Sequence, residues 1–181
     1  MRWLLVLVFL LGMFCEEENF FPRSMASPLL AGSPLSGQTH KDFVFNQQNL
    51  AYSEIIQAKF IDSQFNLSSW FSNRIVHSSF EKTDLKGLLA KNCILENVDF
   101  KNVNLSGAKF TNCQFKNVTF NNCRLDAVQF VAGKFESVHF LNSDLSRLRV
   151  LGGQFKNINI DNESGRNLPS TLQNTFKGQA P

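Results

Sequence analysis

The sequence predicts an all-β solenoid, in which the chain winds through short strands and stacks each coil on the preceding one. Three observations predict this fold: an apolar residue at every fifth position, a smaller residue two positions before it, and similar residues at a spacing of twenty. An α-helix repeats every 3.6 residues and a strand every two, so neither gives apolar spacings that alternate between two and three. The chain must therefore turn by a constant angle in each unit.

The five-residue period runs without a break from Phe45 to Ile160. All twenty-four positions divisible by five in this stretch are apolar, and they hold twelve of the nineteen phenylalanines. In a chain that is 43% hydrophobic, chance would give this pattern roughly once in a billion. Phenylalanine has no polar group, so its excess over one tyrosine and two tryptophans indicates rings that are buried without hydrogen-bond partners.

Each unit combines the two inward residues with Asn, Lys, Gln, Asp or Ser at the remaining positions. Clear examples begin at Val98, Ala108 and Val118. With these units, residues 43–162 resemble the pentapeptide-repeat family. The resemblance implies a right-handed, quadrilateral β-helix with four units per coil, which gives about six coils here.

Residues twenty apart should then lie in columns, and the sequence agrees. One column is predicted to hold Phe60, Phe80, Phe100, Phe120, Phe140 and Ile160, beside another of Leu85, Leu105, Leu125 and Leu145. Trp70 precedes Ala90 in its column, so a large residue neighbours a small one and the core volume is conserved. On the outside, Glu96, Lys116, Glu136 and Lys156 alternate in sign and predict a ladder of charges. Outward asparagines such as Asn92 are expected to stabilise the corners.

Residues 1–15 are predicted to form a signal peptide and lipidation region. Met1 and Arg2 precede an apolar stretch, residues 3–14, which is shorter than the about 20 residues that span a bilayer. Cys15 resembles the acceptor cysteine of a bacterial lipoprotein signal, which implies an acyl anchor on a membrane. The alternative is cleavage after Ala26, which would give a secreted or periplasmic protein. Residues 16–41, rich in Pro and Ser, are predicted to be a flexible tether.

The solenoid is expected over residues 42–162, followed by a C-terminal cap or tail over residues 163–181. Asn167, Leu168 and Pro169 are typical of a helix start, and Leu172 and Phe176 would lie on one face of that helix. A short capping helix and an extended tail both remain open.

The four cysteines are too few for a disulfide scaffold. Cys93 and Cys113 are twenty apart in the inward register, so an inter-coil disulfide is one hypothesis. The alternative is that both are small buried residues that fill slots taken elsewhere by Val or Ala. Cys123 is expected to be a free buried thiol. No metal site is predicted, because no CxxC or HxxxH spacing occurs.

Outward apolar residues suggest an interaction surface. Val131 and Leu151 are twenty apart, and Leu141 is expected on the next side, so these three form the predicted interaction patch. A protein partner or a second copy of the chain could dock there.

No cofactor, nucleic-acid or catalytic motif is present in the sequence, so the chain is not predicted to be an enzyme. The leading hypothesis is an exported, lipid-anchored structural or protein-interaction module of the cell envelope. The alternative comes from the resemblance, since well-known family members bind DNA gyrase by mimicking duplex DNA. Such mimicry needs a dense negative surface. Residues 43–162 hold thirteen Lys and Arg against ten Asp and Glu, which is the wrong sign.

Overall fold

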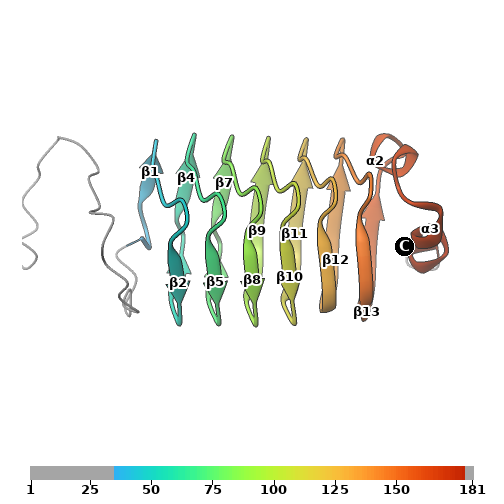
Figure 1. Cartoon of the computed structure of the whole chain (residues 1–181), viewed down its shortest axis with the longest axis horizontal. Coiled ribbons are helices and arrows are strands. Elements are labelled where there is room, and N and C mark those ends of the chain that lie inside the picture. The colour runs from blue at the N-terminus through green and yellow to red at the C-terminus, as the bar shows by residue number, and fades with distance from the viewer. Residues whose placement is uncertain (1–34, 178–181) are drawn as a thin grey trace, which may run out of the picture.

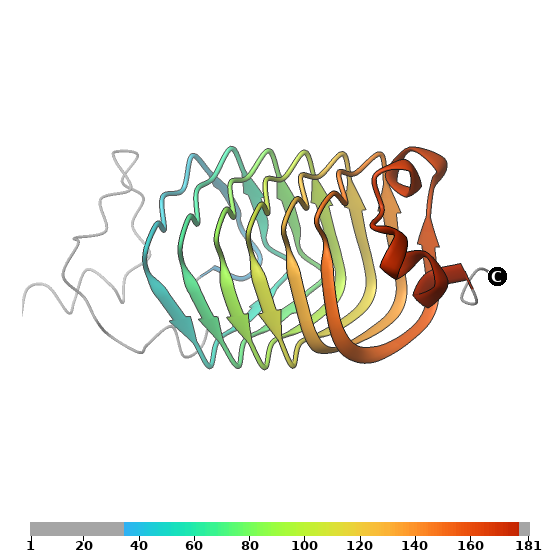
Figure 2. The same cartoon turned by 45° about the vertical axis from the view of Figure 1, so that its right-hand side comes forward.

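The chain coils through parallel strands that stack along one axis (Figure 1). This computed structural model describes residues 35–177. Each strand pairs in parallel with residues twenty positions away; Phe120, for example, lies between Phe100 and Phe140. About six coils follow one another along the rod (Figure 2), which is roughly 29 Å long at a strand spacing of about 4.8 Å. The predicted β-solenoid and its twenty-residue coil are confirmed.

Each coil has four sides, which we number in chain order. Side 1 contains β1 (Thr39–Lys41), β4 (Lys59–Ile61), β7 (Ser79–Glu81) and the ends of β9 (Ile94–Lys101), β11 (Gln114–Asn121), β12 (Gln129–Leu141) and β13 (Arg149–Ile160). Side 2 consists of isolated bridges that join residues 44, 64, 84, 104, 124 and 144. Side 3 contains β2 (Asn49–Ala51), β5 (Ser69–Phe71), β8 (Leu89–Lys91), β10 (Lys109–Thr111) and the starts of β12 and β13. Side 4 contains β3 (Glu54–Ile56), β6 (Arg74–Val76), the starts of β9 and β11, and the middle of β12 and β13.

The corners between sides have a backbone conformation that repeats every five residues. Every fifth residue from Gly37 to Asn157 has a φ between 48° and 71°, in the left-handed region. Asparagine tolerates this region better than most residues, because its short polar side chain hydrogen-bonds locally. The predicted role of Asn92 and the other outward asparagines at the corners is therefore explained by backbone conformation. Asparagine side chains also bond from coil to coil, as Asn117 does to Asn97 over 3.0 Å.

Stacked phenylalanine rings fill the core. In the column on side 1, neighbouring ring centroids are 5.0 Å apart between Phe100 and Phe120 and 5.2 Å apart between Phe120 and Phe140, with nearly parallel planes. A second stack on side 4 joins Phe115 to Phe135 at 4.9 Å and meets the side 3 rings edge to face. Trp70 pairs with Ala90 as predicted. The rings therefore form one continuous apolar core.

The smaller inward residues complete the hydrogen bonds of the corners. Ser143 illustrates their role: its hydroxyl donates to the carbonyls of Leu141 and Phe120, and the backbone N–H of Cys123 donates to it. Without such a partner, a buried N–H or C=O group would cost free energy. Serine and threonine at these smaller inward positions therefore stabilise the corners by satisfying buried backbone groups, and they do not disrupt the core.

Two short helices close the C-terminal end of the rod: α2 (Asn162–Arg166) and α3 (Ser170–Lys177). The side chain of Asp161 caps α2 by accepting from the N–H of Ser164, and the Ser164 hydroxyl braces the last coil by accepting from the N–H of Ser143. Leu172 and Phe176 of α3 are buried, so the predicted capping helix is confirmed for the described residues. The earlier helix α2 was not predicted.

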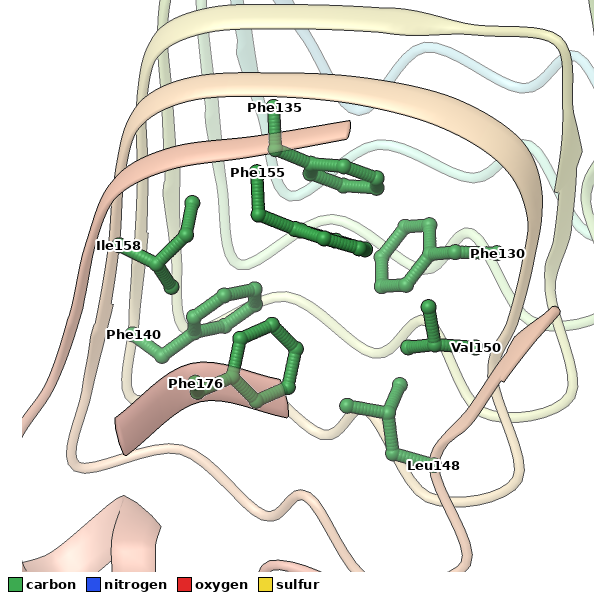
Figure 3. Close-up of a pocket in the computed structure, with 8 residues that line it drawn as sticks. All are labelled: Phe130, Phe135, Phe140, Leu148, Val150, Phe155, Ile158 and Phe176. Atoms are coloured by element: carbon green, nitrogen blue, oxygen red, sulfur yellow. The ribbon is translucent and has the colours of Figure 1, made fainter. Parts of the chain in front are cut away.

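The end of the core under α3 is closely filled. Eight apolar residues line a cavity of only about 10 Å³ there, and Phe176 from α3 points into it (Figure 3). The ring of Phe176 meets Phe155 edge to face, with centroids 5.3 Å apart. A lining without polar groups offers no partner to a water molecule, so the helix seals a dry core.

The N-terminal boundary differs from the predicted one. Leu35 is buried in the core, Gly37 adopts the first corner and Thr39–Lys41 form β1, so residues 35–41 of the predicted tether belong to the solenoid. The rest of the tether up to residue 34, and Cys15, lie outside the described residues. Within residues 35–177, no helix is long and apolar enough to cross a membrane.

Candidate docking side of the solenoid

Side 3 and its two flanking corners carry most of the large exposed apolar side chains among the described residues. Tyr52, Leu67, Leu89 and Leu151 are 70%, 60%, 53% and 57% exposed. Phe71 is half-buried and meets the ring of Tyr52 edge to face, with centroids 5.3 Å apart. Because β2, β5, β8, β10 and β12 pair in that order, these side chains lie on one surface, which is concentrated on the N-terminal coils.

The backbone at two of these residues is unusual. Tyr52 and Leu67 occupy the left-handed corner positions, with φ of 52° and 55°. Bulky apolar residues are disfavoured there, and exposure gives their side chains no packing gain from the core. Leu67 lies over Gly87, where a Cβ atom would come within 2.7 Å of its Cδ2. The stability of the fold does not explain why Tyr52 and Leu67 occupy these two corners, so we interpret them as docking residues.

The charges on side 3 have one sign. Lys91, Lys109 and Arg149 project from β8, β10 and β13 and are exposed, and none of them forms an ion pair within the described part of the chain. No carboxylate occupies an outward or corner position of side 3 among residues 47–152. The other sides and corners carry many carboxylates: Glu81, Asp99 and Asp161 on side 1, Asp42 and Asp62 at the corner between sides 1 and 2, Asp84, Asp126 and Asp144 on side 2, and Glu54, Glu96 and Glu136 on side 4. Side 3 is thus both apolar and cationic.

Side 4 has the opposite character, because its charges neutralise one another. Arg74 contacts Glu54 at 2.6 Å and Glu96 at 3.6 Å, and Glu96 also contacts Lys116 at 3.1 Å. Lys156 contacts Glu136 at 2.9 Å, which confirms the predicted ladder. Exposed pairs of this kind add little to stability. A shallow groove of about 400 Å³ runs beside this ladder, but its charges are already largely paired.

The predicted positions of the residues in the interaction patch are correct only in part. Val131 and Leu151 are direct neighbours on β12 and β13 of side 3, as predicted. Leu141 pairs with Asn121 on side 1, half a coil away, so placing it on the next side was wrong. Figure 3 shows why: Phe130 and Phe140 enter the core from opposite sides, and residues 131 and 141 follow them. The sequence reasoning also missed Tyr52, Leu67 and Leu89. The sequence does mark these three residues, because each is an apolar residue at a corner or outward position of the five-residue unit.

Three cysteines lie in the core, and the structure describes Cys93, Cys113 and Cys123 as free, buried thiols. Cys93 and Cys113 occupy equivalent positions in adjacent coils, since their following residues Ile94 and Gln114 pair directly. A hydrogen bond between the two side chains, together with burial, raises the pKa of the Cys113 thiol. The inter-coil disulfide stays a prediction. Among the described residues, no group of three metal-ligating side chains is present.

Cys123 is expected to resist alkylation in the folded protein. Burial raises the pKa of its thiol to about 11, from an ordinary value of 9.0. Since only the thiolate reacts, the rate at pH 8 should be roughly 100-fold lower than in the unfolded chain, and should rise about tenfold per pH unit towards pH 11. Iodoacetamide labelling followed by mass spectrometry, with and without urea, measures the ratio. Equal rates in both states would contradict the burial of this thiol.

The described fold and its flat, apolar and cationic side define a β-solenoid scaffold built from five-residue units. Residues 91–165 match the family model described as Pentapeptide repeat region, and the same unit continues through the preceding coils. Residues 91–165 are thus similar to pentapeptide repeats, and the corner backbone that repeats every five residues extends this unit back to Gly37. No curated protein matches the sequence of this chain.

Several solved structures are similar to this chain. A trypsin-treated form of QnrB1, described as a plasmid-mediated fluoroquinolone resistance protein, is 15% identical, with 81% of this chain and 98% of that chain covered and a TM-score of 0.32. Rfr23 from the cyanobacterium Cyanothece 51142 is 15% identical, with 70% and 90% covered and a TM-score of 0.26. HetL from Nostoc sp. strain PCC 7120, a pentapeptide-repeat protein involved in heterocyst differentiation regulation, is 11% identical, with 69% and 86% covered and a TM-score of 0.22.

Proposed function

We propose that this chain is an exported pentapeptide-repeat protein held on a membrane by a lipid on Cys15, and that its solenoid is a non-catalytic structural or interaction module. The observation that carries the second part is side 3, where exposed apolar residues and unpaired cations share one surface of a regular sheet. Large exposed apolar surfaces on soluble domains mark interaction sites. Export is supported by the N-terminal sequence, with Arg2 before the apolar residues 3–14.

The rod is well suited to hold such a surface in a fixed shape. Its strands are bonded to both neighbouring coils through most of the length, and its core is a continuous stack of rings. In a solenoid of this kind, each repeat is stabilised by its neighbours. A docking partner would therefore meet a preorganised surface and would not have to order it.

The alternative of DNA mimicry and gyrase binding is not favoured by the surface charge. A DNA-like surface needs rows of unpaired carboxylates. Here Glu54, Glu96 and Glu136 on side 4 each contact a lysine or an arginine, and Asp126 on side 2 contacts Arg147. The fluoroquinolone resistance described for QnrB1 is therefore not transferred to this chain.

Mass spectrometry of the mature N-terminus tests the anchor. In bacteria that process lipoproteins, the protein purified from membranes should begin at Cys15 and carry the added mass of acyl chains. A Cys15→Ser variant should no longer be recovered from membranes in this processed, acylated form. The buried Cys123, replaced by Ser, is the matched control and should not change processing. A mature protein that begins after Ala26, or an unprocessed protein in the cytosol, would overturn lipid anchoring.

A further inference from the structure

We infer that side 3 is a membrane-docking surface that lies against the headgroups of an anionic phospholipid bilayer. The inference deepens the proposed function by naming the partner of its interaction surface. It rests on the proposed function, because the preference for a lipid surface over an acidic protein uses the proposed anchor at Cys15. The apolar residues meet the bilayer interface, and Lys91, Lys109 and Arg149 meet the lipid phosphates.

The apolar residues have the chemistry of an interfacial surface. Tyr52 and Phe71 pair at the corner between sides 3 and 4, and Leu67 and Leu89 lie towards the opposite edge of side 3. Aromatic residues concentrate at membrane–water interfaces, and leucines supply apolar area that enters the headgroup boundary. Placing Tyr52 and Leu67 at left-handed corners costs backbone free energy in the unbound protein. Burial in the interface would offset that cost.

The cations supply the selectivity for anionic lipids. Lys91 and Lys109 project from adjacent coils of side 3, and Arg149 lies two coils further along. The nearby Arg147 already contacts Asp126 on side 2, whereas these three lack carboxylate partners among the described residues. Basic residues at a membrane surface each strengthen binding to anionic lipid about fivefold, and the attraction weakens as salt is added.

Position along the rod favours a lipid surface over an acidic protein. Tyr52, Leu67, Phe71 and Leu89 all lie in the N-terminal coils, next to the end from which residues 16–34 lead to the proposed anchor. Fully extended, that segment can reach roughly 60 Å, about twice the length of the rod. The anchor therefore leaves the solenoid free to lie on its side, and the coils closest to the anchor are the apolar ones.

Lysine footprinting on the full chain tests the orientation. The protein is added to vesicles of phosphatidylcholine alone, or of phosphatidylcholine with phosphatidylglycerol, then acetylated with an amine-specific reagent and digested for mass spectrometry. On the phosphatidylglycerol vesicles, we expect acetylation of Lys91 and Lys109 to fall about fivefold or more, and the fall to reverse in high salt. Lys101 and Lys134, on sides 1 and 4, are the internal controls and should stay reactive. Equal protection of all lysines, or none on Lys91 and Lys109, would overturn the inference.

A variant then tests the cause of the protection. Leu67→Asn, Leu89→Thr and Arg149→Glu together leave both reporter lysines in place, and Asn suits the left-handed corner, so the fold should be kept. Protection of Lys91 and Lys109 should be lost in this variant and retained in the control Lys134→Glu, which makes the same change of charge on side 4. Unchanged protection in the variant would contradict the role of side 3.

A third comparison separates the classes of partner. Protection of Lys91 and Lys109 by soluble polyglutamate, but not by phosphatidylglycerol vesicles, would assign side 3 to an acidic protein and overturn the lipid assignment. Failure of the anchor is a distinct result, because it is read from the mass of the mature N-terminus rather than from the lysines.

Discussion

Replacing Phe120 with alanine is expected to lower the free energy of unfolding by about 3 to 5 kcal/mol. Phe120 is fully buried and lies between Phe100 and Phe140, with centroids 5.0 and 5.2 Å away. Coils above and below are held in register by backbone bonds, so the column has little freedom to collapse into the space that the ring leaves. The loss therefore includes both the transfer free energy of the ring and the cost of the cavity.

Urea denaturation followed by circular dichroism measures this loss. Thr119→Ala is the matched control, because Thr119 precedes Phe120 on β11 and projects outward, and its loss should stay within about 0.5 kcal/mol. A loss below about 1.5 kcal/mol for Phe120→Ala would mean that neighbouring rings close the gap, and would contradict the rigid column.

Gly153→Ala is expected to destabilise the last coil by about 2 to 4 kcal/mol. Gly153 has a φ of 129°, outside the corner range, and a Cβ atom there would lie 2.7 Å from the carbonyl oxygen of Gly133. That oxygen belongs to the backbone of the adjacent strand, so it cannot move away as a flexible side chain could. The alanine therefore adds a steric clash to an unfavourable φ.

The neighbouring Gly152 is the control. Its φ is 70°, and no atom lies within 4 Å of the position of a Cβ atom, so Gly152→Ala should cost only about 1 kcal/mol from the left-handed backbone. Thermal unfolding of both variants separates the two contributions. Equal shifts for Gly152→Ala and Gly153→Ala would show that the clash with Gly133 is relieved.

The inward half of the molecule was predictable from the sequence, because burial requires a period. Apolar residues at every fifth position fixed which side chains enter the core, and similarity at twenty fixed which of them stack, as the Phe100, Phe120 and Phe140 column shows. The column of Glu96 and Lys116 was predicted by the same spacing and forms an ion pair. The requirement for a stacked apolar interior therefore produces periods of five and twenty residues that can be recognised in the sequence.

The outward half was less predictable, because solvent tolerates many residues. Leu141 was placed beside Val131, although a separation of ten residues puts them on opposite sides of a four-sided coil. Tyr52 and Leu67 were missed because corner positions are not required to be apolar or polar, only to adopt a positive φ. Helix α2 was missed because its signal is local: Asp161 caps it, while Ser164 still serves the last coil as a brace.

The pairing of each residue with those twenty positions away has a consequence for insertions and deletions. A duplicated stretch of twenty residues lengthens the rod by one coil and keeps every column, including Phe120 under Phe140. An insertion of five residues keeps the large residues inside but moves every following column by one side. Between Lys91 and Lys109, such an insertion would place the two lysines on different sides and divide side 3. A single inserted residue turns inward positions outward for the rest of the chain. Length changes in relatives of this protein should therefore come in whole coils.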